Sequence, residues 1–135
     1  MNILNDTGFT QLRSAIGAAN TRQQVISNNI ANADTPYFKR SEVSFESLLQ
    51  SEMNGVSSIK GRITNPRHIA IGSSNSVPVA KVTSDDSTAM NNNKNNVDID
   101  SEMTSLAENQ LRYNTYIEEV NHQIKMMRAA MGGNV

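Results

Sequence analysis

The feature that most constrains the fold is a row of apolar residues running through the last third of the chain. Its members recur at alternating steps of three and four, with one polar member, Gln110: Ile99, Met103, Leu106, Gln110, Tyr113, Ile117, Val120, Ile124, Met127 and Met131. This 3.5-residue period is typical of a helix whose seam is covered by another helix. Asp98 and Asp100 favour a helix start, and the glycine pair at 132–133 favours a stop, so we predict a helix over about 99–131.

A second row with the same period occupies the first quarter of the chain. It consists of Phe9, Leu12, Ile16, Ala19, Gln23, Ile26 and Ile30. Asp6 or Thr7 is expected to cap this helix, which must end before the Thr35–Pro36 pair because proline lacks an N–H. Asn32 is predicted to adopt the left-handed turn that follows many helices. The glutamine in each row either fixes the register or sits where solvent reaches the seam.

Neither helix can bury its row alone, so the sequence predicts a mainly α fold. Two long terminal helices are expected to pack as a coiled-coil-like pair, parallel or antiparallel, around a flexible, partly β middle segment. Aromatic residues make up only 4% of the chain, which favours an elongated molecule over a large round core. We divide the chain into an N-terminal heptad helix with an Asn/Pro corner (1–34), a loop-rich middle (35–97) and a C-terminal heptad helix (98–135).

The middle of the chain has a different composition. Residues 51–96 are rich in Ser, Asn and Gly, with an asparagine-rich run at 91–96, and are interpreted as a linker with little capacity to bury a core. The islands 67–71 and 77–82 are possible short strands, and Pro78 would confine the second to a sheet edge. A helix of about two turns is predicted around Phe45, Leu48 and Leu49, with Ser44 as its cap.

Few residues in the chain are of the kinds that carry chemistry. There is no cysteine, and the two histidines, His68 and His122, are far apart in sequence, so we expect no metal, no cofactor and no catalysis. The aspartates at 85–86 and 98–100 are explained better by solvated loop charge and a helix start than by a bound cation.

Charge and hydropathy exclude further classes of partner. A net charge of −1 and a pI near 6.1 give no basic footprint for nucleic acid. No apolar run approaches the roughly 20 residues of a membrane span. The N-terminus lacks the basic and apolar regions of a cleaved secretory signal.

The densest polar stretch lies where the first helix should end. Residues 27–39 contain three asparagines, a Thr-Pro step and the adjacent aromatics Tyr37 and Phe38. Asparagine and aspartate side chains can bond the backbone groups freed at a helix end. The stretch is either an elaborate helix stop or a corner that positions the following segment against a neighbouring subunit, and the residues alone leave both readings open.

The octet at 29–36, Asn-Ile-Ala-Asn-Ala-Asp-Thr-Pro, resembles the N-terminal signature of the axial proteins of the bacterial flagellum, which form its rod, hook and hook-associated parts. The stretches 37–39, 43–49, 65–69, 96–103 and 109–113 are similar to the rod members of this family. One position departs from the pattern: the family commonly has Gly where this chain has Tyr37. A side chain disfavours positive φ, so the family's turn geometry is not expected there.

The resemblance implies a structural subunit of the proximal rod, placed in the flagellar basal body and exported through the flagellar type III apparatus without cleavage of a signal. It implies packing against other copies, the rod proteins FlgC and FlgF, the adaptor FliE and the export gate. The residues themselves also allow a cytoplasmic coiled-coil adaptor or export chaperone.

The expected assembly interface draws on both apolar rows and on the corner. Its members are Phe9, Leu12, Ile16, Ile26, Asn29, Ile30, Asn32, Thr35, Pro36, Leu106, Tyr113, Ile117, Val120, Ile124 and Met127.

Overall fold

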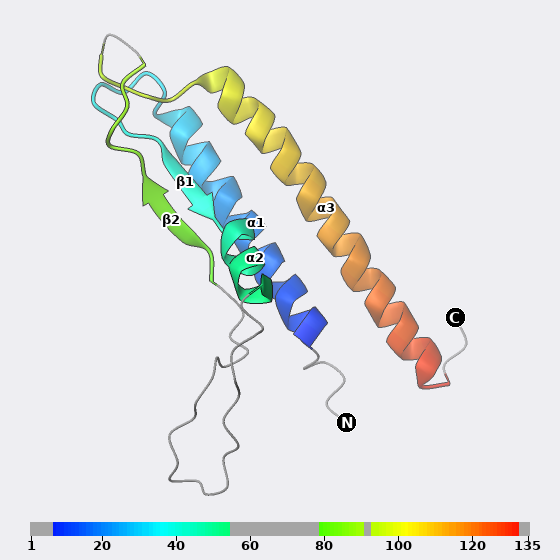
Figure 1. Ribbon diagram of the computed structural model, residues 1–135. Helices are drawn as coiled ribbons and strands as arrows, with labels where there is room; N and C mark the ends of the chain where they lie inside the picture. Colours follow the sequence, from blue (N-terminus) through cyan, green and yellow to red (C-terminus); the bar gives the residue numbers. More distant parts are fainter. Residues whose placement is uncertain (1–6, 55–78, 91–92, 133–135) are drawn as a thin grey trace, which may run out of the picture.

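The computed structural model describes residues 7–54, 79–90 and 93–132. Its elements are α1 (Thr7–Ala31), β1 (Ser41–Ser44), α2 (Glu46–Asn54), β2 (Lys81–Ser84) and α3 (Ile99–Ala130). The two long helices lie side by side, with the end of α1 beside the start of α3 (Figure 1). Asn29 contacts Glu102 and Ala19 contacts Asn109, so the pair is antiparallel. The predicted mainly α fold with a paired set of terminal helices is confirmed.

Helix α3 begins and ends where the sequence signals lie. Oδ1 of Asp98 accepts from the backbone N–H of Asp100 at 3.0 Å and of Ser101 at 3.5 Å, which satisfies donors that have no partner inside the helix. At the other end Met131 donates to the carbonyl of Met127 at 3.1 Å, and Gly132 adopts φ 78°. The helix therefore stops at a left-handed glycine.

The end of α1 corrects the prediction for Asn32, which does not take the left-handed conformation. Its backbone N–H donates to the carbonyls of Asn28 and Asn29, and its Nδ2 donates to Asn28 O at 2.8 Å. Asn32 thus closes the last turn of α1 with both its backbone N–H and its side chain.

Tyr37 takes the left-handed conformation instead, at φ 62°, although a side chain disfavours it. Its N–H donates to the carbonyl of Asn93 at 3.0 Å, and Nζ of Lys94 lies 5.6 Å from the centre of its ring. These tertiary contacts outweigh the local steric preference. The side chain at Tyr37 therefore does not prevent a positive φ, although the sequence had cast doubt on such a turn there.

The buried seam of the helix pair is rotated by about one position from the predicted rows. On α1 the buried residues include Ala19 and Ile26 of the predicted row, and Ala15, Ala18 and Asn29 beside it. On α3 they are Glu102 and Asn109. Apart from Ile26, the seam is therefore built from small and polar side chains, and most of the larger apolar residues of the predicted rows are only half-buried or exposed.

A small apolar core forms where α2 and the strands pack on the helix pair. Phe45 is buried against Ala15 and Ala18, and Leu49, Ala80 and Tyr116 pack around them. The predicted short helix is confirmed as α2, but its first turn is closed by Leu49 N–H donating to the carbonyl of Phe45 at 2.8 Å. The cap position is thus Phe45, one residue after the predicted Ser44.

The two strands form an antiparallel ribbon in which Val43 faces Val82 and Ser41 faces Ser84. Strand β2 overlaps the end of the predicted island at 77–82, whereas β1 was not predicted. The island at 67–71 lies outside the described residues.

The last part of the predicted linker is in fact buried. Asn95, Asn96 and Val97 are enclosed, and Asn95 has no solvent-exposed surface at all. Composition indicated solvation here, but the side chains of this asparagine run are used as hydrogen-bonding groups inside the molecule.

Candidate assembly surface and its polar frame

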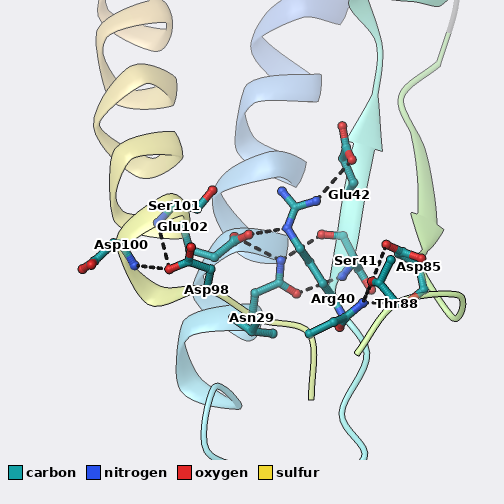
Figure 2. A network of polar contacts seen from close by, with 12 residues as sticks. Asn29, Arg40, Ser41, Glu42, Asp85, Thr88, Asp98, Asp100, Ser101 and Glu102 are labelled. Carbon is teal, nitrogen blue, oxygen red and sulfur yellow. Dashed lines mark hydrogen bonds and ion pairs between the residues drawn. The ribbon is translucent and has the colours of Figure 1, made fainter. Parts of the chain in front are cut away.

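A network of buried polar side chains ties the ends of the two long helices together (Figure 2). At its centre is Glu102 of α3, whose side chain is fully enclosed. Its Oε1 accepts from Nε of Arg40 at 2.5 Å, and its Oε2 accepts from Nδ2 of Asn29 at 3.1 Å. Both carboxylate oxygens thus have partners, as a buried charge requires.

Asn29 links α1 to the strand ribbon by acting as a short piece of strand. Its Oδ1 accepts from the N–H of Ser41 at 3.0 Å, and its Nδ2 donates to the carbonyl of Ser41 at 2.8 Å. The two backbone groups of Ser41 are those that a neighbouring strand would occupy. The asparagine side chain therefore fixes where β1 lies against the helix.

Arg40 supplies the positive charge that Glu102 needs. Burial alone would lower the pKa of Arg40, but the hydrogen bond and the charge of Glu102 outweigh it and raise the pKa above its usual value. Arg40 also contacts Glu42 at 3.2 Å, and its backbone N–H donates to Oδ1 of Asn96 at 2.6 Å. The guanidinium therefore stays charged and held in place.

Asn95 joins the end of α1 to the start of α3. Its Nδ2 lies 2.9 Å from each of the carbonyls of Asn32, Ala33 and Thr35, and its Oδ1 accepts from Val97 N–H at 2.6 Å. Carbonyls at a helix C-terminus lack partners inside the helix. These three carbonyls lie in the turn just after α1, and they share the two N–H groups of a side chain that lies 60–63 residues further along. The corner is therefore a joint between two distant segments.

The loop after β2 is fixed by Asn96 and Asp85. Nδ2 of Asn96 donates to Asp85 O at 2.9 Å and to Oγ1 of Thr88 at 2.8 Å. Hydrogen bonds from Ser87 and Thr88 lower the pKa of Asp85. Asp85 therefore stabilises its own turn by accepting hydrogen bonds from Ser87 and Thr88.

The part of the chain that the structure describes holds no group of three or more His, Cys, Asp or Glu residues that could bind a metal ion.

A second charged contact joins α1, α2 and α3. Glu46 of α2 accepts from Arg22 of α1 at 2.5 Å and from Arg112 of α3 at 3.0 Å. Burial would raise the pKa of Glu46, but the hydrogen bond from Arg22 and the charges of both arginines outweigh it and lower the pKa.

Away from these polar contacts, α3 carries apolar side chains that the described parts of the chain leave uncovered. The exposed fraction is 41% for Ile124 and 70% for Met131. Other large apolar residues exposed on this helix are Ile99, Met103, Leu111 and Met126. No described helix has a stretch long and apolar enough to cross a bilayer.

The predicted interface residues fall into three groups by burial. Ile26 and Asn29 are buried, and Thr35, Pro36 and Ile124 are exposed. The others are half-buried along the flanks of the seam: Phe9, Leu12, Ile16, Ile30, Asn32, Leu106, Tyr113, Ile117, Val120 and Met127.

Sequence reasoning missed the residues that build the frame, namely Glu102, Arg40, Asn95, Asn96 and Glu46. One signal was available for α3. Glu102 and Asn109 are seven residues apart, on the same helical face as the apolar Leu106 and Tyr113. A polar pair at heptad spacing beside an apolar row marks a buried polar seam.

An antiparallel pair of terminal helices, joined by buried polar side chains and bearing exposed apolar residues along α3, is an arrangement typical of structural proteins that assemble. Residues 12–39 match the family model described as flagella basal body rod protein.

Curated relatives cover nearly the whole chain. The chain is 38% identical over 133 residues to the flagellar basal body rod protein FlgB of Bacillus subtilis, covering 98% of each. It is 41% identical over 119 residues to FlgB of Borreliella burgdorferi, covering 82% of this chain and 84% of that one. It is 31% identical over 140 residues to FlgB of Salmonella typhimurium, covering 96% of each. The chain therefore belongs to the FlgB family of flagellar basal body rod proteins, and it is a structural subunit of the flagellar basal-body rod. The alternative of a cytoplasmic adaptor or chaperone finds no support among these relatives.

Proposed function

We propose that the chain carries out its structural role purely by packing, without catalysis, and that its apolar flanks and Asn/Pro corner are the surfaces that meet neighbouring subunits. The proposed neighbours are other copies of the chain, the rod proteins FlgC and FlgF, the adaptor FliE and the export gate. The proposed route is export through the flagellar type III apparatus without removal of a signal.

The proposal rests on the difference between the buried and the exposed residues of α3. Its inner face is filled by Glu102 and Asn109, whereas Met103, Ile124 and Met131 remain exposed. Fully burying an apolar side chain of this size contributes about 1.5–3 kcal/mol. Side chains that are half exposed in the single chain gain only part of this when covered. Repeated in every subunit, such contacts stiffen a helical array.

Replacing Ile124 by Asp tests the flank. Because Ile124 is 41% exposed in the single chain, Ile124→Asp should lower the free energy of unfolding by less than about 1 kcal/mol. In the rod the new carboxylate would be buried without a partner, so we expect at least a tenfold loss of the chain from purified basal bodies and loss of swimming.

Asn121→Asp is the matched control, since it adds the same charge at an exposed position of the same helix. We expect this variant to swim normally. If Ile124→Asp also assembles normally at wild-type protein levels, the apolar flank is not an assembly surface. Cross-linking of the basal bodies followed by mass spectrometry identifies the neighbours of the chain. Peptide analysis of the same preparation shows whether its N-terminus is intact.

A further inference from the structure

The strand ribbon has one edge that the described parts of the chain leave open. Strand β1 lies between β2 and α1, so β2 forms the outer edge of the ribbon (Figure 1). All four residues of β2, from Lys81 to Ser84, are exposed. The outer edge of such a strand presents backbone N–H and C=O groups that can pair with another strand.

The pairing inside the ribbon shows which backbone groups of β2 point outward. Ser41 turns both of its backbone groups to Asn29, and alternation along β1 places those of Val43 on the same side. In an antiparallel pair, residues that turn away from the other strand face residues that do the same. Their partners on β2 are Ser84 and Val82. The N–H and C=O groups of Val82 and Ser84 therefore point out of the ribbon, and no residue that the structure describes bonds them.

This outer edge is complementary to a second copy of itself. When two copies meet in antiparallel fashion around a twofold axis at Thr83, Val82 of each copy faces Ser84 of the other. Facing residues whose backbone groups point toward each other exchange both N–H···O bonds. All the outward groups of the two residues are then satisfied in both copies.

The charges at the edge fit the same register. Lys81 stands opposite Asp85 of the other copy, because the two residues are equally far from Thr83 on either side. Their side chains lie on the face that carries Thr83, since alternate residues of a strand share a face. Lys81 has no ion pair with another described residue. A lysine usually protects an edge strand from pairing, but here it meets an opposite charge, which favours pairing.

The carboxylate of Asp85 has capacity for this contact. Its Oδ1 accepts from the N–H and the hydroxyl of Ser87, at 3.0 Å and 2.7 Å. Its Oδ2 accepts from the hydroxyl of Thr88 at 2.8 Å. Each carboxylate oxygen has about two acceptor sites, so Oδ2 can accept from an ammonium group as well.

We propose that β2 is a self-pairing edge, through which two copies of the free chain join their ribbons into one antiparallel sheet with a twofold axis at Thr83. Val82, which is 48% exposed in the single chain, gains a cross-strand neighbour. A twofold contact closes on itself and does not extend an array. The dimer is therefore a form of the free chain, separate from the contacts of the rod, and it covers an edge that could otherwise pair with unrelated strands.

One introduced cysteine tests the register, because the chain has no cysteine of its own. In Thr83→Cys the two thiols face each other across the axis, with the Cα separation of about 4.5 Å that is typical of a pair without hydrogen bonds. A disulfide can span this distance. We expect oxidised glutathione to convert most of the purified full-length variant into a covalent dimer. Thr83 is exposed, so helix content by circular dichroism should be unchanged.

Glu42→Cys is the matched control, since Glu42 is exposed and lies directly beside Thr83 on the same face of the ribbon. It leaves Lys81 and Asp85 in place, but three strand spacings, or about 14 Å, separate its thiol from that of the other copy. A disulfide cannot span this distance, so dimer should form about tenfold more slowly or not at all. Equal rates would show random collision and would overturn the inference, as would a Thr83→Cys chain that stays monomeric.

Sedimentation equilibrium tests the charges in a chain without cysteine. The wild type should show a weak, concentration-dependent dimer. Lys81→Glu places like charges opposite each other and should raise the dissociation constant about fivefold. Lys125→Glu, with the same change in charge at an exposed position of α3, should leave it unchanged. Equal effects of the two substitutions, or no effect of either, would show that the copies associate through another surface and would refute pairing through β2.

Discussion

At the scale of single residues, the fold depends on a few buried polar side chains. Glu102, Asn29 and Asn95 are each fully enclosed, and each joins segments that are far apart in the sequence. A buried charge with both oxygens satisfied contributes little net stability compared with an apolar pair, but removing one partner is costly. The main role of these residues is therefore to determine which segments meet. Their net contribution to the free energy of folding is small.

Replacing Glu102 by Gln should expose this dependence. The amide accepts only through its oxygen, so it turns an NH₂ toward one of the two donors, Arg40 or Asn29, and leaves Arg40 without its buried counter-charge. We expect the free energy of unfolding to fall by about 2–3 kcal/mol, below the 3–5 kcal/mol of fully buried pairs because Arg40 is 30% exposed.

Urea denaturation followed by circular dichroism measures this change. Glu118→Gln, at an exposed glutamate of the same helix, should change the free energy of unfolding by no more than about 0.5 kcal/mol. Equal effects of the two substitutions would contradict a special role for Glu102.

Glu46 gives a prediction about pH. Its pKa is lowered in the folded chain, so the folded state binds its proton less readily than the unfolded state. The resulting stability is present above the usual carboxylate pKa of 4.5 and is lost as pH falls through the lower folded value. Because the side chain is 46% exposed, we expect less than about 1 kcal/mol.

The comparison to make is wild type against Glu46→Gln at pH 7 and at pH 3. The difference in the free energy of unfolding should be largest at pH 7 and should shrink toward pH 3. Taking the difference between the two chains removes the contribution of Asp85, which titrates in the same direction. A difference that grows on acidification would show that the pKa of Glu46 is not lowered.

At the scale of elements, the sequence predicted the helices well and their contacts poorly. Capping and stop signals such as Asp98 and Gly132 act locally, so the bounds of α3 could be read from the sequence. The buried face of α1 could not, because Ala15 and Ala18 are not part of a large apolar row and are buried only because α3 and Phe45 pack on them. Strand β1 was missed for a similar reason, since Asn29 and β2 supply its partners.

The turn after α1 is also fixed by contacts between distant segments, since Tyr37 is held at φ 62° by Asn93 and Lys94. Tyr37→Ala and Tyr37→Gly both remove the ring, but only glycine relieves the backbone strain. We expect the glycine variant to be more stable than the alanine variant by about 1 kcal/mol.

The same pair of substitutions at exposed Gln24 of α1 should give the opposite order, because glycine is about 1 kcal/mol worse than alanine inside a helix. Thermal or urea melts of the four variants supply the measurement. Alanine proving the better residue at both positions would mean that Tyr37 does not hold a left-handed conformation.

At the scale of the whole molecule, the helices differ in length, with 25 residues in α1 and 32 in α3. At 1.5 Å per residue they span about 37 Å and about 48 Å. The end of α3 projects beyond the start of α1 (Figure 1). Gly8 and Gln123 line the same groove, so the projecting part begins near Ile124.

Hydrogen exchange of the isolated chain should follow this geometry. Amides of α3 between Glu102 and Tyr116, which face α1 and the small core, should exchange slowest, and those after Ile124 fastest, because only the former need the pair to open. Even protection along α3 to its last turn would show that the projecting end is stabilised within the single chain.

The contacts of Asn95 with the carbonyls of residues 32–35 have a consequence for variation in chain length. They bring the point where the chain leaves α1 next to the point where it returns to α3, so the segment between them is an excursion whose two ends are held together. Part of the excursion, from Arg40 to Glu46, is itself packed on the helices. Doubling the length of such a loop adds only about 0.6 kcal/mol of closure entropy. Segments can therefore be added to or removed from the excursion over evolution while the two long helices keep their alignment.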